Sequence, residues 1–263
     1  MRVALCQITS VSDPAVNLER VRAGISWAAS QGAAVALFPE ATMACFGTAL
    51  APLAEPIDGP WATAVREIAD AHRMLVVTGM FTPAPRGRVY NTLLVTGRDH
   101  HLGYRKVHLF DAFGFRESET VAPGDDVLTV SLDGTVFGLA TCYDVRFPEL
   151  FRALADRGAT AVLLGASWGA GDGKREQWEL LVRARALDST CWVLACDQAD
   201  PLASEIAAAP HAPTGIGYST VADPTGRVRA QLGDGPDGLV VEIDSGLVES
   251  TRRAIPVLAN RRL

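Results

Sequence analysis

The sequence has no excess of positive charge and no long apolar run. Its 263 residues include 24 lysines and arginines against 30 aspartates and glutamates, which gives a formal net charge of −6. Binding to a phosphate backbone requires a basic face, so this balance argues against a nucleic-acid partner. No segment approaches the roughly 20 apolar residues that a membrane-spanning helix needs. We therefore expect neither nucleic acid nor a membrane as a partner.

Cysteine and histidine are sparse and scattered. The five cysteines are odd in number, form no CxxC pair and lie in apolar segments, and the five histidines add no metal-ligand spacing. We therefore expect reduced thiols and no metal site. The first residues lack an apolar run long enough for the core of a signal peptide, so the protein is expected to be cytoplasmic.

The chain also lacks a proline-, glycine- or serine-rich linker, an internal repeat and a run of like charges. Residues 1–263 are therefore predicted to form a single domain. Short apolar runs alternate with helical patterns along this whole length. Two helix-flanked sheets account for so many strands, which predicts an α/β fold.

Apolar periodicity, with glycine and proline as boundary signals, predicts the individual elements. The expected helices are a segment whose apolar face includes Leu18, Val21, Ile25 and Ala29, and the segments Pro60–His72, Pro148–Arg157 and Lys174–Ser189. The expected strands are Arg2–Ile8, Ala33–Phe38, Met74–Met80, Tyr90–Thr96, His101–Leu109, Ala159–Ala166, Cys191–Asp197, Tyr218–Ala222, Val228–Leu232 and Leu239–Ile243. Asp133–Gly134 is expected to be a hairpin turn, and Asp200–Gly215 a loop.

Three reactive side chains, Glu40, Lys106 and Cys142, stand where apolar strands give way to loops. In α/β folds, ligands tend to bind at this position. A carboxylate at the end of a buried strand has a raised pKa, as a general base needs. Alternation along its predicted strand places Lys106 on one face with Tyr104 and His108.

Each of these side chains also has an ordinary explanation. A loop glutamate and a strand lysine are usually exposed, and a buried cysteine usually behaves as a small hydrophobe. Together they favour catalysis, because a thiol that attacks a carbonyl needs a base for its proton and a positive donor for the oxyanion. Glu40, Lys106 and Cys142 meet these needs.

The segments around these residues resemble the three catalytic segments of the nitrilase superfamily of carbon–nitrogen hydrolases. They are Phe38–Glu40, Lys106–Phe110 and Thr141–Leu150, in the family's order and with spacings that suit it. The resemblance extends over nearly the whole chain through the segments Phe115–Gly124, Trp178–Ala186, Gly217–Pro224 and Ile255–Val257. Several ordered landmarks make this match more specific than a lone cysteine motif.

The resemblance implies a four-layer αββα sandwich that pairs with a second subunit, so we expect a homodimer or a larger even homo-oligomer. The expected helix Lys174–Ser189 has apolar residues on more than one side, which favours the same assembly. Cys142 then lies on the turn beyond the sheet. Asp144, Arg146 and Glu149 are expected to fix this turn as a local ion-pair network.

The resemblance also implies a mechanism. Glu40 is the general base, and Cys142 attacks an amide carbon to form a thioester. Lys106 and the backbone N–H of Tyr143 stabilise the oxyanion. Ammonia or an amine leaves, water completes the hydrolysis, and neither a metal nor an organic cofactor is required. Glu117 matches the family's second glutamate, which positions the substrate and the lysine.

The assignment of Glu117 has an alternative, because Glu119 lies two residues away on the same strand-like face. A Cys–His hydrolase is a second enzyme hypothesis, with His108 as the best partner for the thiol. A nucleotide-binding module is another, because Gly165–Arg175 follows a strand and precedes a helix, although it departs twice from the phosphate-loop pattern. The last hypothesis is a non-catalytic assembly protein that retains the sandwich fold without the chemistry.

The substrate follows least directly from the sequence. Leu109–Ser118 looks most like Nit-type small amidases, which act on ω-amides of dicarboxylic acids and on deaminated glutathione. Ser167–Arg175 departs from the Phe-Asn type segment of those relatives. We expect a small carboxylated amide, with Lys174 or Arg175 binding the carboxylate and Trp168 as an apolar wall. The alternative enzymes are an N-carbamoyl amino acid amidohydrolase and a nitrilase. The alternative for the two cations is a solvated position at the start of the helix.

Overall fold

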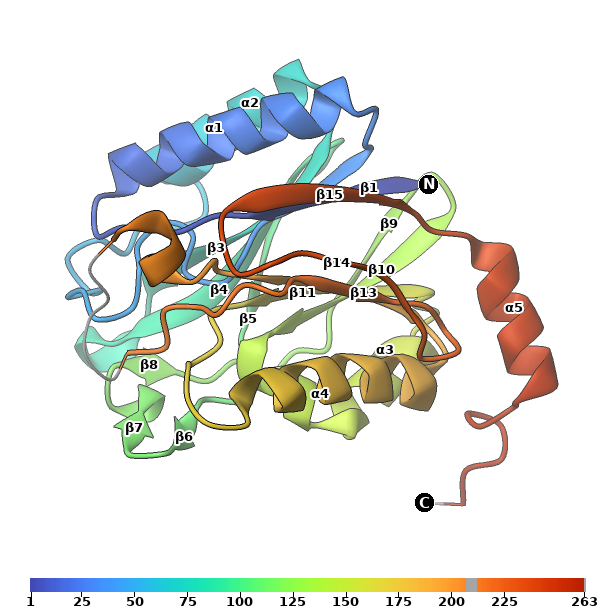
Figure 1. Cartoon of the computed structure of the whole chain (residues 1–263). Coiled ribbons are helices and arrows are strands. Elements are labelled where there is room, and N and C mark those ends of the chain that lie inside the picture. The colour runs from blue at the N-terminus through green and yellow to red at the C-terminus, as the bar shows by residue number, and fades with distance from the viewer. Residues whose placement is uncertain (207–211, 263) are drawn as a thin grey trace.

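A computed structural model describes residues 1–206 and 212–262. Part of the expected loop Asp200–Gly215 therefore lies outside the described residues. The remainder shows two sheets packed face to face between two pairs of helices (Figure 1). The first sheet is covered by α1 (Pro14–Ser30) and α2 (Pro60–Ala71), and the second by α3 (Pro148–Asp156) and α4 (Lys174–Ser189). This arrangement is the expected αββα sandwich.

The first sheet has the strand order β15-β1-β2-β3-β4-β5, with β8 beside β4. Its strands are β1 (Arg2–Gln7), β2 (Val35–Leu37), β3 (Leu75–Pro83), β4 (Val89–Gly97), β5 (His100–Arg105), β8 (Val121–Ala122) and β15 (Asp237–Glu242). The strands β1, β2 and β3 are parallel, and α1 and α2 form the crossovers between them. Both faces of these strands are covered, which explains their continuous apolar runs.

The second sheet has the order β14-β13-β12-β11-β10-β9. Its strands are β9 (Thr129–Leu132), β10 (Thr135–Thr141), β11 (Ala161–Ala166), β12 (Trp192–Asp197), β13 (Thr220–Ala222) and β14 (Val228–Gln231). The parallel strands β10, β11 and β12 are joined by α3 and α4. The hairpin turn predicted at Asp133–Gly134 is confirmed, because it joins the antiparallel strands β9 and β10.

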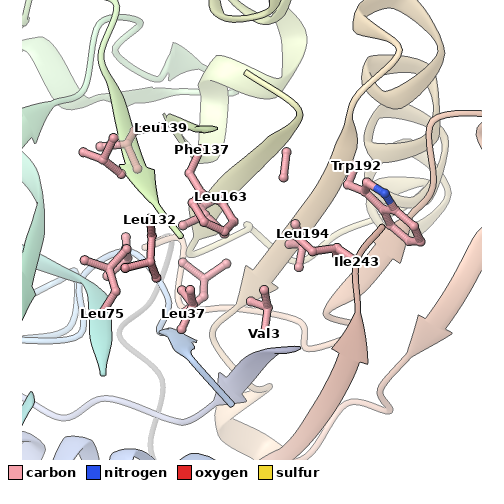
Figure 2. Close-up of a cluster of buried hydrophobic side chains, with 14 of the residues drawn as sticks. Val3, Leu37, Leu75, Leu132, Phe137, Leu139, Leu163, Trp192, Leu194 and Ile243 are labelled. Atoms are coloured by element: carbon pink, nitrogen blue, oxygen red, sulfur yellow. The ribbon is translucent and has the colours of Figure 1, made fainter. Parts of the chain in front are cut away.

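The two sheets meet in a core of aliphatic and aromatic side chains (Figure 2). The first sheet contributes Val3, Leu37 and Leu75, and the second contributes Phe137, Leu163 and Leu194, all fully buried. These side chains come from alternate positions on their strands, and the intervening positions face the covering helices. The core therefore fixes how the carboxyl ends of one sheet lie against those of the other.

Helix limits follow the boundary signals in the sequence. The Asp13 side chain accepts a hydrogen bond from Ala15 N at the start of α1, and Gly32, with φ 72°, follows its end. Proline occupies the first position of α2 and of α3, where its missing N–H has no helical partner to lose. The predicted limits of α4, Lys174–Ser189, are confirmed.

Several features differ from the sequence prediction, and the short strand β8 was among those not expected. The strand expected at His101–Leu109 ends at Arg105, so Lys106 and His108 do not share a strand face with Tyr104. The chain turns away there because Asp144 Oδ1 accepts from His108 N at 3.0 Å. A helix, α5 (Ser245–Ala254), and a small hairpin, β6 (Asp111–Ala112) with β7 (Phe115–Arg116), were not expected. Their short apolar patterns are too weak to predict either element.

Strand β3 passes directly behind the segment that carries Glu40. Gly79 N donates to Pro39 O at 3.0 Å. A Cβ atom at Gly79 would lie 2.5 Å from Ala41 N and 2.8 Å from Glu40 Cα. Glycine is therefore required at this position so that the strand can approach the Glu40 backbone.

We expect Gly79→Ala to lower the free energy of unfolding by about 1–3 kcal/mol, because the added methyl group overpacks against backbone atoms. Gly233→Ala is the matched control, since a Cβ there meets nothing within 4 Å. Its effect should stay within about 0.5 kcal/mol. Urea unfolding measures both variants, and equal stability of the two would contradict the close approach.

Candidate active site

The three predicted reactive residues come from different elements and lie around one pocket. Glu40 follows β2, Lys106 follows β5 directly, and Cys142 follows β10 directly. Glu117 begins a 3₁₀ turn, Glu117–Glu119, after β7 and lines the same pocket. The ends of strands from both sheets therefore supply the residues of the site.

Two buried carboxylates share one ammonium group. Lys106 Nζ lies 2.9 Å from Glu40 Oε1 and 2.8 Å from Glu117 Oε2. The three side chains are each 2% exposed or less. Glu119 is exposed, because the 3₁₀ turn replaces the expected strand and points the two glutamates in different directions. Glu117 is therefore the glutamate that pairs with Lys106.

Burial governs the protonation of these groups. It raises the pKa of Glu40 above its ordinary value of 4.5, against the opposing effect of the Lys106 charge. Burial alone would lower the pKa of Lys106, but the carboxylates of Glu117 and Glu40 hold it well above its usual range. Burial, and then the Glu40 charge, raise the pKa of Cys142 well above its usual value. Both effects favour the neutral form of the thiol, which needs a base to become a nucleophile.

Cys142 occupies a sharp turn. Strand β10 ends at Thr141, a 3₁₀ turn spans Cys142–Arg146, and Cys142 itself has φ 44°, a left-handed conformation that L-residues rarely adopt. Cys142 Sγ lies 3.7 Å from Ser167 O, and Ser167 N donates to Glu40 Oε2 at 2.9 Å. Ser167 therefore links the thiol to the Glu40 carboxylate.

The ion-pair network expected for this turn is wrong. Asp144 forms no ion pair with Arg146; its buried carboxylate accepts from Thr141 N at 2.8 Å. Arg146 donates to Gln177 Oε1 at 2.6 Å, and Glu149 is exposed. The turn leaves backbone N–H groups without helical partners, and the Asp144 carboxylate satisfies one of them.

The geometry does not support a Cys–His pair. His108 Nδ1 lies 2.7 Å from Asp144 Oδ1, and its ring stacks on Phe147 with 3.7 Å between centroids. Tyr104 Oη donates to Asp144 Oδ2 at 2.8 Å, which completes a network behind the turn. The thiol of Cys142 points instead toward Ser167 O.

The pocket is narrow and lies between side chains from both sheets. Aromatic side chains form much of its wall: Phe46, Phe110, Phe115, Tyr143 and Trp168. Trp168 lies where a residue that forms an apolar wall of the pocket would lie. Lys174 and Arg146 add two positive charges to the lining.

Lys174 has no carboxylate partner among the described residues. Its side chain is largely buried, with Nζ 3.6 Å from the centroid of the Phe113 ring. Burial, and then the Arg146 charge, lower the pKa of Lys174. Arg175, the alternative cation, lies outside the pocket, where it pairs with Glu179 at 2.9 Å and stacks over Tyr218. The structure therefore brings only the first of the two predicted cations to the site.

The loop before α4 does not form a phosphate cradle. Ser167 N and Trp168 N donate to the carboxylates of Glu40 and Asp197, so a phosphate would have to displace both. Within the described residues, no group of three or more His, Cys, Asp or Glu side chains is arranged to hold a metal ion. No helix in that part of the chain is long and apolar enough to cross a membrane. The cytoplasmic location stays a prediction.

Two residues near the site, Asn91 and Asp197, escaped the sequence analysis, and a third, Arg146, was expected in a different role. Asn91 on β4 donates from Nδ2 to Glu40 Oε1 at 2.7 Å and to Glu117 Oε1 at 3.0 Å. Asp197, fully buried at the end of β12, holds Trp168 N, and Arg146 lines the pocket instead of an ion pair. A polar residue within an apolar strand was the available signal for Asn91, because strands are depleted in asparagine.

Comparison with known proteins identifies the family. Residues 2–253 match the carbon–nitrogen hydrolase family model. A hydrolase of Mycobacterium tuberculosis is 50% identical over 99% of this chain and 95% of its own length. The omega-amidase NIT2 of Mus musculus is 34% identical, again over 99% of this chain and 95% of its own.

Two solved structures have the same fold. Nit3 of Saccharomyces cerevisiae, a member of branch 10 of the nitrilase superfamily, has a TM-score of 0.86 at 29% identity and covers 100% of this chain and 97% of its own. A mutant amidase from Nesterenkonia sp. AN1 has a TM-score of 0.81 at 25% identity, covers 100% of this chain and 94% of its own, and has the acetamide moiety of fluoroacetamide added covalently at its active-site cysteine. The chain therefore belongs to the carbon–nitrogen hydrolase family, within the nitrilase superfamily, and is an enzyme that hydrolyses carbon–nitrogen bonds other than peptide bonds.

Proposed function

We propose that the protein is an amidase that hydrolyses a small amide through a thioester on Cys142. The observation that carries this proposal is the buried Glu40–Lys106–Glu117 cluster beside a neutral thiol in an aromatic pocket. The covalent adduct at the cysteine of the Nesterenkonia amidase supports it. The chemistry requires neither a metal nor an organic cofactor.

In the first half-reaction, Cys142 Sγ attacks the amide carbon while Glu40 takes the thiol proton. The carbonyl oxygen becomes negative, and Lys106 with the backbone N–H of Tyr143 stabilises it. The Tyr143 N–H belongs to the first turn of a 3₁₀ segment, where backbone donors lack internal partners. The C–N bond then breaks, Glu40 returns its proton to the nitrogen, and ammonia leaves the thioester behind.

In the second half-reaction, Glu40 removes a proton from water, and the resulting oxygen nucleophile attacks the thioester carbon. The C–S bond breaks, the carboxylic acid leaves, and the sulfur recovers the proton from Glu40. The raised pKa of Glu40 suits a group that accepts and returns a proton in both steps. Lys106 stays charged throughout because Glu117 and Glu40 raise its pKa.

Mass spectrometry after mixing with an amide substrate should show an acyl adduct on the Cys142 peptide, and iodoacetamide should inactivate the enzyme there. Cys142→Ala should be inactive, and Glu40→Gln should lower kcat about 10²–10⁴-fold, as loss of a general base does. Cys45→Ala is the matched control, because Cys45 is a more exposed free cysteine that does not line this pocket. Full activity of Cys142→Ala, or loss in His108→Ala without loss in Glu40→Gln, would contradict the mechanism.

We further propose that the substrate carries a carboxylate that binds Lys174 and Arg146. The Lys174 side chain is largely buried and its ammonium lies over an aromatic ring, and Arg146 Nε is buried without a hydrogen-bond partner in the described residues. Such groups gain a charge-assisted hydrogen bond when an anion enters. An ω-amide of a dicarboxylic acid fits this pattern, as the omega-amidase relatives suggest; an N-carbamoyl amino acid is the alternative.

An ammonia-release screen across succinamate, 2-oxoglutaramate, deaminated glutathione, N-carbamoyl amino acids and simple nitriles identifies the class. Lys174→Met should raise KM for the best carboxylated amide about 10–100-fold, which corresponds to one lost charge-assisted hydrogen bond. Arg175→Ala should leave KM unchanged, because Arg175 pairs with Glu179 outside the pocket. Faster turnover of neutral amides or nitriles than of every carboxylated amide would overturn this substrate class.

We also propose that residues 1–263 form one domain that assembles as a homodimer or a larger even oligomer. Leu180 and Leu187, one heptad apart on α4, are 64% and 47% exposed. Ile255, just beyond α5, is 52% exposed and lies beside Leu187 around one surface hollow. An apolar helix face of this kind usually requires cover.

Light scattering at micromolar concentration should give the mass of a dimer or larger even assembly, and Leu180→Glu should shift it toward the monomer because a charge would be buried in the interface. Leu202→Glu is the matched control, since Leu202 is 77% exposed but lies on a different surface, in the 3₁₀ turn Pro201–Ser204. A monomeric mass for the unmodified protein would refute the assembly.

A further inference from the structure

We propose that Asn91 is a positioning residue that holds the Glu40 and Glu117 carboxylates and favours the ionised form of Glu40, so that Glu40 is available as the base for the thiol. This inference rests on the proposed role of Glu40 and adds a residue that does not line the pocket. Asn91 acts through the two glutamates and does not touch the substrate.

Asn91 contacts both carboxylates of the cluster and the backbone of the lysine between them. One N–H of its side-chain amide donates to Glu40 Oε1 at 2.7 Å, and the other donates to Glu117 Oε1 at 3.0 Å. Its backbone carbonyl accepts from Lys106 N at 2.8 Å. A single residue of β4, paired with Phe81 in β3, therefore holds both carboxylates and the backbone from which the Lys106 side chain extends.

The charge of the cluster explains why a neutral donor is required. Two carboxylates face one ammonium, and Lys106 is the cation paired with either of them in the described part of the chain. Like charges that share a buried site tend to take up a proton. Asn91 gives each carboxylate a hydrogen bond without adding charge, which favours the ionised form of Glu40.

The orientation of the Asn91 amide follows from the same contacts. Its Nδ2 faces two carboxylate oxygens, and the reversed amide would place Oδ1 against both. In the observed orientation, Oδ1 is buried without a hydrogen-bond partner in the described residues. An unpaired buried carbonyl destabilises a fold, so packing alone does not account for this residue. The hydrogen bonds from its two N–H donors account for its presence.

Other charged groups around Glu40 stay in place when Asn91 is changed. Lys106 approaches from the end of β5, Glu117 from the 3₁₀ turn, and Cys142 from the end of β10. The buried Asp197 at the end of β12 adds a further carboxyl group nearby. Substitution of Asn91 therefore removes donors from the two glutamates without removing a charge.

The test follows the pH dependence of Cys142 alkylation by iodoacetamide without substrate, and of kcat/KM with the best amide. Loss of the amide donors leaves Glu40 protonated up to a higher pH. The acid limb, the part of each pH profile where the rate rises with pH, should therefore move to higher pH by about one unit in Asn91→Ala. Asn91→Asp, which keeps the side-chain shape but adds a third carboxyl group, should move it further. Asn17→Ala is the matched control, because Asn17 is fully buried and holds the backbone of Val11 and Met43.

Asn17→Ala should lose stability in urea unfolding without a shift of the limb. An unchanged limb in Asn91→Ala and Asn91→Asp would overturn the inference, even if both variants lost stability. Glu40→Gln separates this result from failure of the mechanism itself. If Glu40→Gln abolishes the acid limb while the Asn91 variants keep it at the pH of the unmodified protein, only the role of Asn91 is wrong. If the limb persists in Glu40→Gln, the proposed base is wrong as well.

Discussion

The site depends on one ammonium group that is shared by two buried carboxylates. Lys106 Nζ lies within 2.9 Å of an oxygen of Glu40 and of Glu117, and water is almost fully excluded from all three. An unpaired charge at this depth would cost several kcal/mol. The fold therefore has to deliver the three side chains together, with Asn91 and the backbone N–H of Ser167 as further donors.

This requirement explains why the site lies where the two sheets meet. Glu40, Lys106 and Asn91 belong to strands of the first sheet or their ends. Cys142 and Ser167 follow strands of the second sheet, and the Ser167–Glu40 hydrogen bond crosses between the sheets. The apolar core that joins the sheets (Figure 2) thus also sets the distance between the Cys142 thiol and the Glu40 carboxylate. A shift of one sheet against the other would separate them.

Apolar periodicity predicted most strands and the helices of both covering layers, because it reports which face of each element is buried. It also placed Glu40 and Cys142 correctly at strand ends. The end of β5 at Arg105 and the contacts of Asn91 depend on partners from distant segments, Asp144 and the two glutamates. No local pattern encodes such partners, so these features required the structure.

The choice between the two neighbouring cations, however, was present in the sequence. On a helix, residues four apart lie on one face, so Lys174 shares a face with Trp178 and Val182. Both of these apolar side chains are fully buried against the second sheet, which turns Lys174 inward. Arg175 lies about 100° around the helix from Lys174, on a neighbouring face with Glu179, and pairs with it at the surface. The packing of α4 therefore decides which of the two positive charges lines the pocket.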